Sequence, residues 1–496
     1  MKSFIKIHKN DNVAISIRNL TKGEIIENED LTLTLKEDIP KGHKFSLYEI
    51  NGDENIVKYG FPIGHATEKI EEGFWVHSHN MKTNLSGVEE YEYKQKQRPL
   101  TYKQEGLTFK GYRRDNGQVG IRNELWIVPT VGCVNGIADQ IIQEFKNQVG
   151  NSMPFDSIQV LKHNYGCSQL GDDHVNTRTI LGNAVKHPNA GGVLVLGLGC
   201  ENNDIDEFRD SLGVINEHRI KFLRSQEVAN EIDEGLKLLL SIYESAKKDK
   251  REDVPISELK VGLKCGGSDG FSGITANPLL GKLSDYLIAQ NATTVLTEVP
   301  EMFGAEKLLM ERAVNEEVYR KIVSLINDFK HYFQSYNQPV YENPSPGNKA
   351  GGITTLEDKS LGCTQKAGSA PVVDVLKYGE RIKSRGLNLL NAPGNDLVAS
   401  TALAASGCQM VLFTTGRGTP FGSFVPTMKI STNTEIYETK PHWIDFNAGT
   451  IIEDQEPETL LRSFIDYIIK VASGELVNHE KNHFREMAIF KNGVTL

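Results

Sequence analysis

Residues 1–87 alternate apolar and polar side chains over short stretches that turn residues separate. The alternation is clearest in FIKIHK, NVAISIRNL, LTLTLKE and NIVKYGFPI, with KGE, PKGH and NGDE between them. A period of two places successive side chains on opposite faces, as in a half-buried strand, and glycine and proline favour turns. The pattern therefore predicts a small β-rich domain at residues 1–87.

The alternation stops at residue 88. Residues 88–106, VEEYEYKQKQRPLTYKQEG, are charged and rich in glutamine, and a proline and a glycine interrupt them. Such a stretch has no apolar periodicity that would predict a helix or a strand. We therefore expect a linker between domains here.

From residue 107 onward, apolar strand-like runs alternate with amphipathic stretches. Examples are ELWIVPTVG followed by NGIADQIIQEFKNQ, and SIQVLKHNYG followed by DDHVNTRTILGNAV. This alternation is typical of a mainly parallel sheet that helices cover on both faces. The charged stretch KKDKREDVP interrupts the series, which resumes with LKVGLKCGG, ATTVLTEV, LNLLNAPG and QMVLFTTG. The fold class we predict is α/β, with two α/β domains, at residues 107–250 and 251–496, after the β-rich domain.

Composition and charge narrow the classes of function. The 496 residues include 55 Lys and Arg and 65 Asp and Glu, a formal charge of −10, so nucleic acid and anionic membranes are poor partners. No stretch approaches the roughly 20 apolar residues of a membrane span, and the first residues lack a signal-peptide core. We therefore expect a cytoplasmic protein. Its 6 cysteines are too few for a disulfide framework and are expected to be thiols, metal ligands or residues that fill the core.

The segment VHSHN places two histidines and an asparagine within four positions. In an extended strand His77 and His79 point to the same side, so both imidazoles could bind one metal ion, with Asn80 next to them. An exposed strand end with two solvated histidines explains the same motif, so the motif alone does not decide between the two.

Polar groups follow the predicted strands of the α/β regions, at the edge where open parallel sheets bind ligands. They are Cys133, Asn135, His163, Cys167, Ser168, Gln169, Cys200, Glu201, Asn202, Lys264, Cys265, Ser268, Asp269, Glu298, Glu301, Cys363, Lys366 and Arg417. Glycine turns that expose N–H groups beside Lys, Arg, Ser and Asn suit the carboxylate and hydroxyls of a sugar acid. Glycine–cysteine pairs can equally be small residues that let a strand and a helix pack closely.

Two sharper motifs are missing from the sequence. It contains no G-x-x-x-x-G-K-[ST] and no C-x-x-C, and GRGTPFG has the wrong glycine spacing for a dinucleotide site. The interpretation that remains is a catalytic metal ion held by residues that are far apart in the sequence. Imidazole with carboxylate suits Fe(II) or Mn(II), and thiolate favours iron or zinc.

Longer strings resemble those of a known family. They include NGQVGIRNELWIVPTVGCVNGIA, HNYGCSQLGDDH, CGGSDGFSGITANP, ENPSPGNKAGGITTLEDKSLGCTQKAG and GRGTPFGSFVPT, and they extend to the terminal FREMAIFKNGVTL. With KYGFPIGHA and VHSHN they cover essentially the whole chain. The sequence resembles the altronate/galactarate dehydratases.

The resemblance implies an N-terminal domain of the SAF type and a two-part catalytic region. It also implies dehydration of D-altronate to 2-dehydro-3-deoxy-D-gluconate during galacturonate breakdown, with Fe(II) as the cofactor and Mn(II) able to replace it. Neither periodicity nor composition leads to these expectations.

Dehydration of a 2,3-dihydroxy acid removes the C2 proton beside a carboxylate and expels the C3 hydroxyl. The reaction needs a general base, a general acid and positive charge near the developing enediolate. The residues that we expect in proton transfer are His77, His79, His163 and Glu298. Those expected to bind the metal are His77, His79 and Cys167. Those expected to bind the sugar acid are Asn80, Lys264, Ser268 and Arg417.

Other interpretations stay open. The cysteines Cys133, Cys167, Cys200 and Cys265, all near predicted strand ends, would suit a [4Fe–4S] hydro-lyase, although adjacent C-x-x-C spacing is missing. The substrate could be a related sugar acid such as galactarate. The chain could also bind a sugar acid as a receptor without converting it. A homodimer is the commonest assembly of soluble enzymes.

Overall fold

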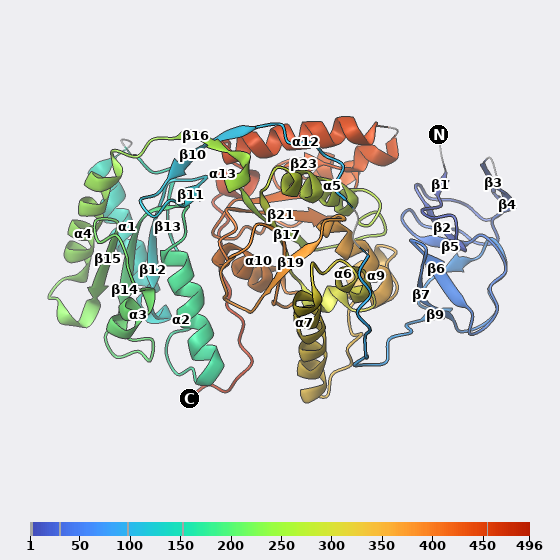
Figure 1. The fold of residues 1–496 in the computed structure, drawn as a ribbon, viewed down its shortest axis with the longest axis horizontal. Coiled ribbons are helices and arrows are strands. Elements are labelled where there is room, and N and C mark those ends of the chain that lie inside the picture. The colour runs from blue at the N-terminus through green and yellow to red at the C-terminus, as the bar shows by residue number, and fades with distance from the viewer. Residues whose placement is uncertain (1–2, 29–30, 97–98, 151–152, 454) are drawn as a thin grey trace.

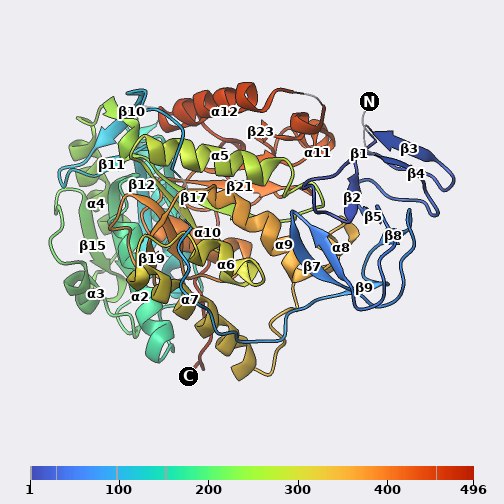
Figure 2. The same cartoon turned by 45° about the vertical axis from the view of Figure 1, so that its right-hand side comes forward.

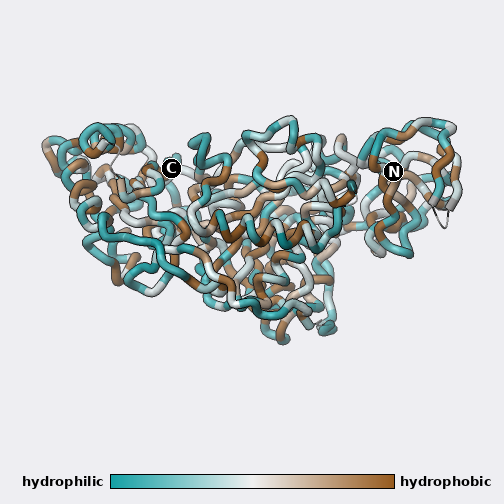
Figure 3. The backbone as a smooth tube through the Cα atoms, turned by 90° about the horizontal axis from the view of Figure 1, so that it is seen from above, coloured by the Kyte–Doolittle hydropathy of each residue, from teal (hydrophilic) through white to brown (hydrophobic). Residues whose placement is uncertain are grey.

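The computed structural model describes residues 3–28, 31–96, 99–150, 153–453 and 455–496, so residues 97 and 98 of the predicted linker lie outside it. Three parts follow one another along an elongated molecule (Figure 1). A β-rich N-terminal domain forms a separate lobe at one end, clearest from above (Figure 3), and a four-stranded sheet lies at the other end. A seven-stranded sheet lies between them. The predicted α/β class with a small β-rich first domain is confirmed.

The N-terminal domain consists of short antiparallel strands. One sheet has the order β1-β2-β5-β8, another β6-β7-β9, and β3 and β4 pair with each other. Their bounds are Phe4–Ile5, Val13–Ser16, Ile25–Asn28, Leu31–Thr34, Lys44–Ser46, Asn55–Lys58, Phe61–Ala66, Trp75–Val76 and Met81–Lys82 for β1 to β9. The inward-facing apolar residues that set the alternation fill its core, among them Ile15, Phe45 and Ile63, each at most 1% exposed.

The chain from residue 83 to residue 107 forms neither helix nor strand where the structure describes it. It nevertheless packs on the central part: the Tyr91 hydroxyl donates to Glu306 Oε1 at 2.6 Å, and the Tyr93 ring lies 4.9 Å from that of Tyr319. The tyrosines of the predicted linker therefore hold it against the central part of the molecule.

The second part has a parallel sheet of order β13-β12-β14-β15. Its strands are Glu124–Pro129 (β12), Ser157–Val160 (β13), Ala190–Gly197 (β14) and Ile220–Arg224 (β15), and its helices are Asn135–Val149 (α1), Gly171–Val185 (α2), Ile205–Leu212 (α3) and Glu231–Ala246 (α4). Leu125 and Ile127 pack with α1 and α4, whereas Trp126 and Val128 face α2 and α3. An antiparallel sheet of β11 (Val119–Gly120), β10 (Thr108–Arg113) and β16 (Glu252–Pro255) joins this part to the next.

The third part contains a parallel sheet of order β19-β20-β18-β17-β21-β22-β23. The strands are Lys260–Cys265 (β17), Thr293–Leu296 (β18), Val372–Leu376 (β19), Gly386–Leu390 (β20), Met410–Thr415 (β21), Thr427–Ser431 (β22) and Phe446–Asn447 (β23). The helices are Ala276–Ala289 (α5), Glu306–Met310 (α6), Glu316–Ser335 (α7), Pro346–Ala350 (α8), Leu356–Cys363 (α9), Asp396–Ala405 (α10), Thr434–Thr439 (α11), Pro457–Ala472 (α12) and Asn478–Lys481 (α13). Figure 2 shows α9 between this sheet and the N-terminal domain.

The central strands β17, β18 and β21 are buried at nearly every position because helices cover both faces of the sheet. Helices α5 and α12 pack against each other, and α10 packs on β17 and also on α2 of the second part. Among the described helices, none is long and apolar enough to cross a membrane.

Candidate active site

Charged side chains gather in the interior at the carboxyl ends of β17 and β18. Lys264, on β17, pairs with Glu298, just after β18, and its Nζ also lies 2.9 Å from Asp396 Oδ1. Glu298 accepts a hydrogen bond from the Cys265 N–H at 3.0 Å. Burial alone would lower the pKa of Lys264, but the Glu298 and Asp396 carboxylates raise it above its usual value, so this lysine is charged.

Two more lysines reach the same place from α9 and the turn after it. Lys366 Nζ lies 2.9 Å from Glu298 Oε2, and Lys359 Nζ lies 2.8 Å from Glu301 Oε1. All four side chains are at most 7% exposed. Burial would raise the pKa of Glu301, but Lys359, Lys264 and Lys366 hold it at about 2. The result is a charge-balanced network of ammonium and carboxylate groups inside the protein.

Glu298 has a left-handed backbone conformation, with φ of 69°. A residue with a Cβ adopts this region rarely, and such strain persists only where surrounding contacts impose it, often at functional sites. Here the contacts are the two lysines and the Cys265 N–H that its carboxylate accepts from. The left-handed turn directs the Glu298 carboxylate toward the carboxyl end of the neighbouring strand β17.

The N-terminal domain contributes two further buried lysines. Lys44 Nζ and Lys58 Nζ each lie 2.9 Å from one of the carboxylate oxygens of Asp358, which precedes Lys359 on α9. Burial lowers the pKa of Lys44 to about 8, although Asp358 partly opposes the shift. Since Asp358 pairs with both lysines, α9 is held between the N-terminal domain and the central sheet.

A small cavity of about 10 Å³ lies beside the network, enough for one water molecule. Its walls include Ser268, Asp269, Lys359 and Cys363. The Ser268 hydroxyl is buried and has no hydrogen-bond partner within the protein. An unpartnered buried hydroxyl is costly, so this one marks a position where a bound molecule can supply a partner.

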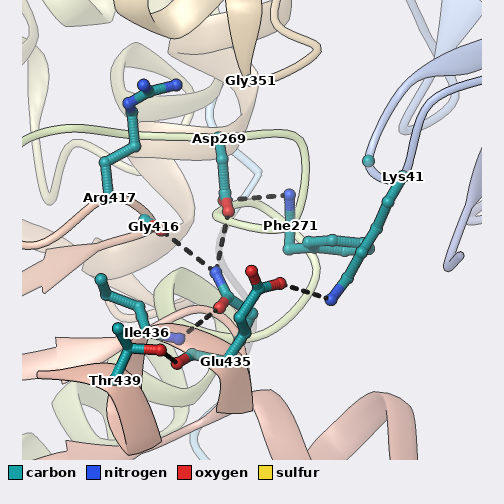
Figure 4. Close-up of a pocket in the computed structure, with 11 residues that line it drawn as sticks. Lys41, Asp269, Phe271, Gly351, Gly416, Arg417, Glu435, Ile436 and Thr439 are labelled. Atoms are coloured by element: carbon teal, nitrogen blue, oxygen red, sulfur yellow. Dashed lines mark hydrogen bonds and ion pairs between the residues drawn. The ribbon is translucent and has the colours of Figure 1, made fainter. Parts of the chain in front are cut away.

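A larger pocket of about 410 Å³ opens between the N-terminal domain and the third part (Figure 4). Asp269 lines both the pocket and the small cavity. Lys41 reaches from the N-terminal domain to Glu435, at 3.3 Å, and Arg417 lies on the opposite side of Asp269 from Glu435. The volume is in the range of small-molecule sites.

Asp269 is fixed by four donors. Its carboxylate accepts from the Phe271 N–H, from Ser272, from Thr432 at 2.9 Å and from Asn433 at 3.2 Å. Burial raises the pKa of Asp269, and these hydrogen bonds only partly oppose the shift. A carboxylate with a raised pKa in a pocket is suited to accept a proton near neutral pH.

Four of the predicted site residues lie in this region. Lys264 and Glu298 belong to the buried network, Ser268 lines the small cavity, and Arg417 lines the larger pocket. Lys359 is not among the predicted site residues, because charged residues on a helix usually indicate a face exposed to solvent. The sequence also gave no reason to select Glu301, Cys363 and Lys366 from among the many polar groups near strand ends.

His77 and Asn80 lie where the N-terminal domain meets α8. His77 Nε2 lies 2.9 Å from the Lys349 carbonyl, and its ring stacks on that of His43 at 5.3 Å. Asn80 accepts from the His77 N–H and donates to the Trp75 carbonyl, so it closes a turn. His79 is exposed, and its ring lies 5.3 Å from that of Trp75. The roles of the three predicted residues stay predictions.

His163 and Cys167 lie in the second part, on the loop after β13. His163 Nε2 is 2.8 Å from the Pro129 carbonyl, and burial lowers the pKa of this imidazole. Cys167 is exposed. The N-terminal domain and this loop lie at opposite ends of the molecule (Figure 1). A single copy of the chain therefore does not bring Cys167 close to His77 and His79.

Among the described residues, three possible metal ligands come close together: Cys265, Glu301 and Cys363. Their ligand atoms are 3.3 to 3.4 Å apart. However, Lys366 Nζ is 2.6 Å from Cys265 Sγ, and Lys359 pairs with Glu301. Two ammonium groups already balance these ligands and would repel a divalent cation, so the set does not fit the Fe(II) that the resemblance implies.

Fold and site together define a multidomain α/β enzyme whose pocket lies against a β-rich domain. Three family models match: the altronate/galactarate dehydratase SAF domain at residues 2–84, the D-galactarate dehydratase/altronate hydrolase second domain at 111–247, and the D-galactarate/altronate dehydratase C-terminal domain at 256–495. The chain belongs to the altronate/galactarate dehydratase family.

Relatives agree over the full length. An altronate dehydratase of Bacillus subtilis is 66% identical, over 100% of both chains, and one of Escherichia coli is 57% identical, over 99% of this chain and 100% of that one. The galactarate dehydratase (L-threo-forming) of Escherichia coli is 36% identical, over 95% of this chain and 93% of that one.

Proposed function

We propose that this chain is a hydro-lyase that dehydrates D-altronate to 2-dehydro-3-deoxy-D-gluconate in galacturonate breakdown. The observation that carries the proposal is the full-length similarity to two altronate dehydratases, at 66% and 57% identity. Galactarate is the second candidate substrate, because a galactarate dehydratase is 36% identical.

The pocket can meet the first demand of this reaction, which is removal of the C2 proton. Asp269, whose pKa burial raises, is the group we assign as general base, because it borders both the pocket and the small cavity. Ser268 and Arg417 are assigned to the sugar acid: the unpartnered hydroxyl can donate to one oxygen that enters the small cavity, which has room for a single water-sized group, and the guanidinium can pair with the carboxylate in the larger pocket.

The second demand is stabilisation of the negative charge that builds up beside the carboxylate. Lys359 lines the small cavity as an ammonium group, since burial would lower its pKa but Glu301 raises it above the usual value. Lys264, Lys366 and Glu298 lie behind it and keep this positive charge fixed in place. A preorganised charge in a dry site stabilises such an intermediate better than water does.

The cofactor is part of the proposal. Iron dependence, with Mn(II) as a possible replacement, follows from the family resemblance alone, with His77 and His79 as the predicted ligands, whereas the buried Cys265 set does not fit Fe(II). We also propose that the enzyme is cytoplasmic and assembles as a homodimer. We further propose that it does not bind nucleic acid, which is consistent with its net charge of −10.

An assay of 2-keto acid formation tests the proposed function. The purified protein, supplied anaerobically with ferrous iron, is incubated with D-altronate and, separately, with galactarate. We expect kcat/KM to be at least tenfold higher for D-altronate. Faster turnover of galactarate would transfer the assignment to the second candidate, and saturable binding of altronate without any product would show a receptor instead.

A further inference from the structure

The small cavity beside the buried network also has a wall from the N-terminal domain. Tyr59, which directly follows β6, lines it together with Gly273 and Gly362 of the third part. A Cβ at Gly273 would lie 2.2 Å from the Tyr59 hydroxyl oxygen, and a Cβ at Gly362 would lie 3.5 Å from it. The hydroxyl therefore lies against the backbone of these two glycines, at the cavity.

Tyr59 occupies an unusual position in its hairpin. Strands β6 and β7 pair as far as Lys58 and Phe61, so the turn between them consists of Tyr59 and Gly60 alone. Both turn residues have positive φ, 60° and 79°. A two-residue turn of this kind favours asparagine, aspartate or glycine, because other residues with a Cβ are strained there. Strained residues gather at functional sites, where surrounding contacts hold them in place.

The residue before Tyr59 fixes the turn against the third part. Lys58 is buried, and its Nζ lies 2.9 Å from Asp358 Oδ1 on α9. Strand β7 packs on the same helix (Figure 2). The Lys58 ammonium also lies 4.6 Å from the centre of the Tyr59 ring. The position of the phenol is therefore set by a buried ion pair and by packing on α9.

The phenol keeps its proton at neutral pH. Burial raises the pKa of Tyr59 to about 12, and the charge of Lys58 only partly opposes the shift. When the proton leaves, the same ammonium group faces the phenolate and stabilises it, because a preorganised charge needs no rearrangement. Tyr59 is therefore suited to donate a proton at the cavity.

The proposed dehydration needs such a donor. Asp269 is assigned as the base, but the C3 hydroxyl leaves readily only when it gains a proton and departs as water. The small cavity has room for one water molecule, and the buried Ser268 hydroxyl beside it has no partner within the protein. The departing oxygen fits this cavity, where the Ser268 and Tyr59 hydroxyls can both reach it.

We propose that Tyr59 is the general acid of the dehydration, a role that rests on the proposed function. Asp269 takes the C2 proton, the electron pair of the C2–H bond forms the C2–C3 double bond, and the C3–O bond breaks. Tyr59 gives its proton to the departing oxygen, which leaves as water. The enol then moves its hydroxyl proton to C3 and becomes the 2-keto acid. Solvent returns the proton from Asp269 to the Tyr59 phenolate.

Tyr59→Phe removes only the hydroxyl and tests this role. We expect kcat for the sugar acid that the wild type converts to fall by about a hundredfold or more, with KM and urea unfolding close to those of the wild type. The control is Tyr48→Phe, on the same domain but 49% exposed, which should keep the wild-type kcat. A kcat of Tyr59→Phe within about tenfold of the wild type would overturn the role. A wild-type protein that converts neither D-altronate nor galactarate would contradict the proposed function instead.

A substrate analogue separates proton donation from positioning. In the 3-deoxy-3-fluoro analogue of the sugar acid, fluoride leaves C3 without gaining a proton, and the same enol forms. Tyr59→Phe should therefore release fluoride at a rate within about fivefold of the wild type. A loss of fluoride release as large as the loss with the sugar acid would show that the hydroxyl positions the substrate and is not the acid.

Discussion

Glu298 is held by opposite charges on both carboxylate oxygens. One oxygen pairs with Lys264, and the other lies 2.9 Å from Lys366 Nζ and 3.0 Å from the Cys265 N–H. Inside a protein, removing one member of such a set leaves its partners charged and without compensation, which costs more than the pairing itself contributes. Lys264 and Lys366 therefore share this one carboxylate as a partner.

Glu298→Gln should both unfold more easily and lose activity. The amide keeps the shape but not the charge, so we expect about 3–5 kcal/mol of lost unfolding free energy, measured in urea. We also expect at least a hundredfold lower rate of dehydration, because the lysines are displaced. The control is Glu316→Gln, whose exposed pairing with Arg320 contributes about 0.5 kcal/mol or less. Equal, small effects in both variants would show that the network is dispensable.

Ser268→Ala tests the sugar-acid site without disturbing the fold. The hydroxyl has no partner in the protein, so its removal should leave the unfolding free energy unchanged or slightly raised. If the hydroxyl binds substrate, KM should rise about tenfold. Ser272→Ala is the matched control, because its hydroxyl bonds to Asp269 and should affect stability as well as KM. An unaltered KM in Ser268→Ala would remove this serine from the site.

How far the sequence predicts the site depends on the side chain. Lys264, Ser268, Glu298 and Arg417 follow predicted strands, and the rule that ligands bind at the carboxyl ends of parallel strands brings them into one region. Lys359 could not be found this way. It lies on α9, where every residue from Leu356 to Cys363 is buried. No local sequence pattern shows that the charged residues of this helix have partners inside the protein.

At the scale of elements, two imidazoles fasten the N-terminal domain to α8. His43 Nε2 lies 3.2 Å from the Ala350 carbonyl, and His77 Nε2 lies 2.9 Å from that of Lys349. Carbonyl oxygens only accept, so both Nε2 atoms carry hydrogen, and Trp75 donates to His43 Nδ1 at 3.3 Å. This arrangement requires a neutral His43 ring, because its Nδ1 accepts a hydrogen bond. Burial first, and the positive charge of a protonated His77 and of Lys44 to a smaller degree, lower the pKa of His43 to about 4.

Docking of the N-terminal domain should therefore weaken in acid. The folded pKa of His43, about 4, lies below its ordinary value of 6.5, so the unfolded chain binds more protons between these values. Stability is fully present above pH 6.5 and falls as the pH drops toward 4, by about 1–3 kcal/mol between pH 7.5 and 5.

Unfolding in urea at both pH values measures this loss. His43→Gln should show a smaller difference between the two pH values than the wild type, whereas His442→Gln, at an exposed position, should show the wild-type difference. Identical pH dependence in His43→Gln and the wild type would rule out His43 as its source.

Apolar periodicity predicts the existence of helices and strands better than it predicts where they begin and end. The helices expected from residues 135 and 172 and the strands β17, β18, β20 and β21 of the central sheet are confirmed, because their apolar spacing matches burial. Within the N-terminal domain, the predicted runs shorten to strands of two to six residues, since antiparallel pairs there end at tight turns. Strands β19, β22 and β23 of the central sheet were not predicted: β22 is polar at several buried positions, and β23 is only two residues long.

At the scale of the whole molecule, the pocket and the exposed cysteines lie apart. The pocket borders the N-terminal domain, whereas Cys133, Cys167 and Cys200 belong to the part with the four-stranded sheet, at the opposite end of the molecule (Figure 1).

Within one chain, a buried arginine couples the two α/β parts. Arg122, directly before the four-stranded sheet, donates to both carboxylate oxygens of Glu480 on α13, at 2.9 and 2.8 Å, and to the Val471 carbonyl at the end of α12. Neither charged side chain is more than 2% exposed. Burial would raise the pKa of Glu480, but Arg122 holds it at about 2, so the pair is ionic at neutral pH.

Arg122→Met should separate the unfolding of the two parts. It leaves the Glu480 carboxylate without its bidentate partner and removes the hydrogen bonds to the Ile121, Val471 and Glu475 carbonyls, a loss of about 3–5 kcal/mol that falls on the boundary between the parts. Calorimetry should then resolve two transitions in place of one. Arg113→Met, which removes a surface pair with Glu252, changes stability by about 0.5 kcal/mol or less and is the control. A single transition at the control's temperature would mean that apolar packing between α2 and α10, and not this ion pair, unites the two parts.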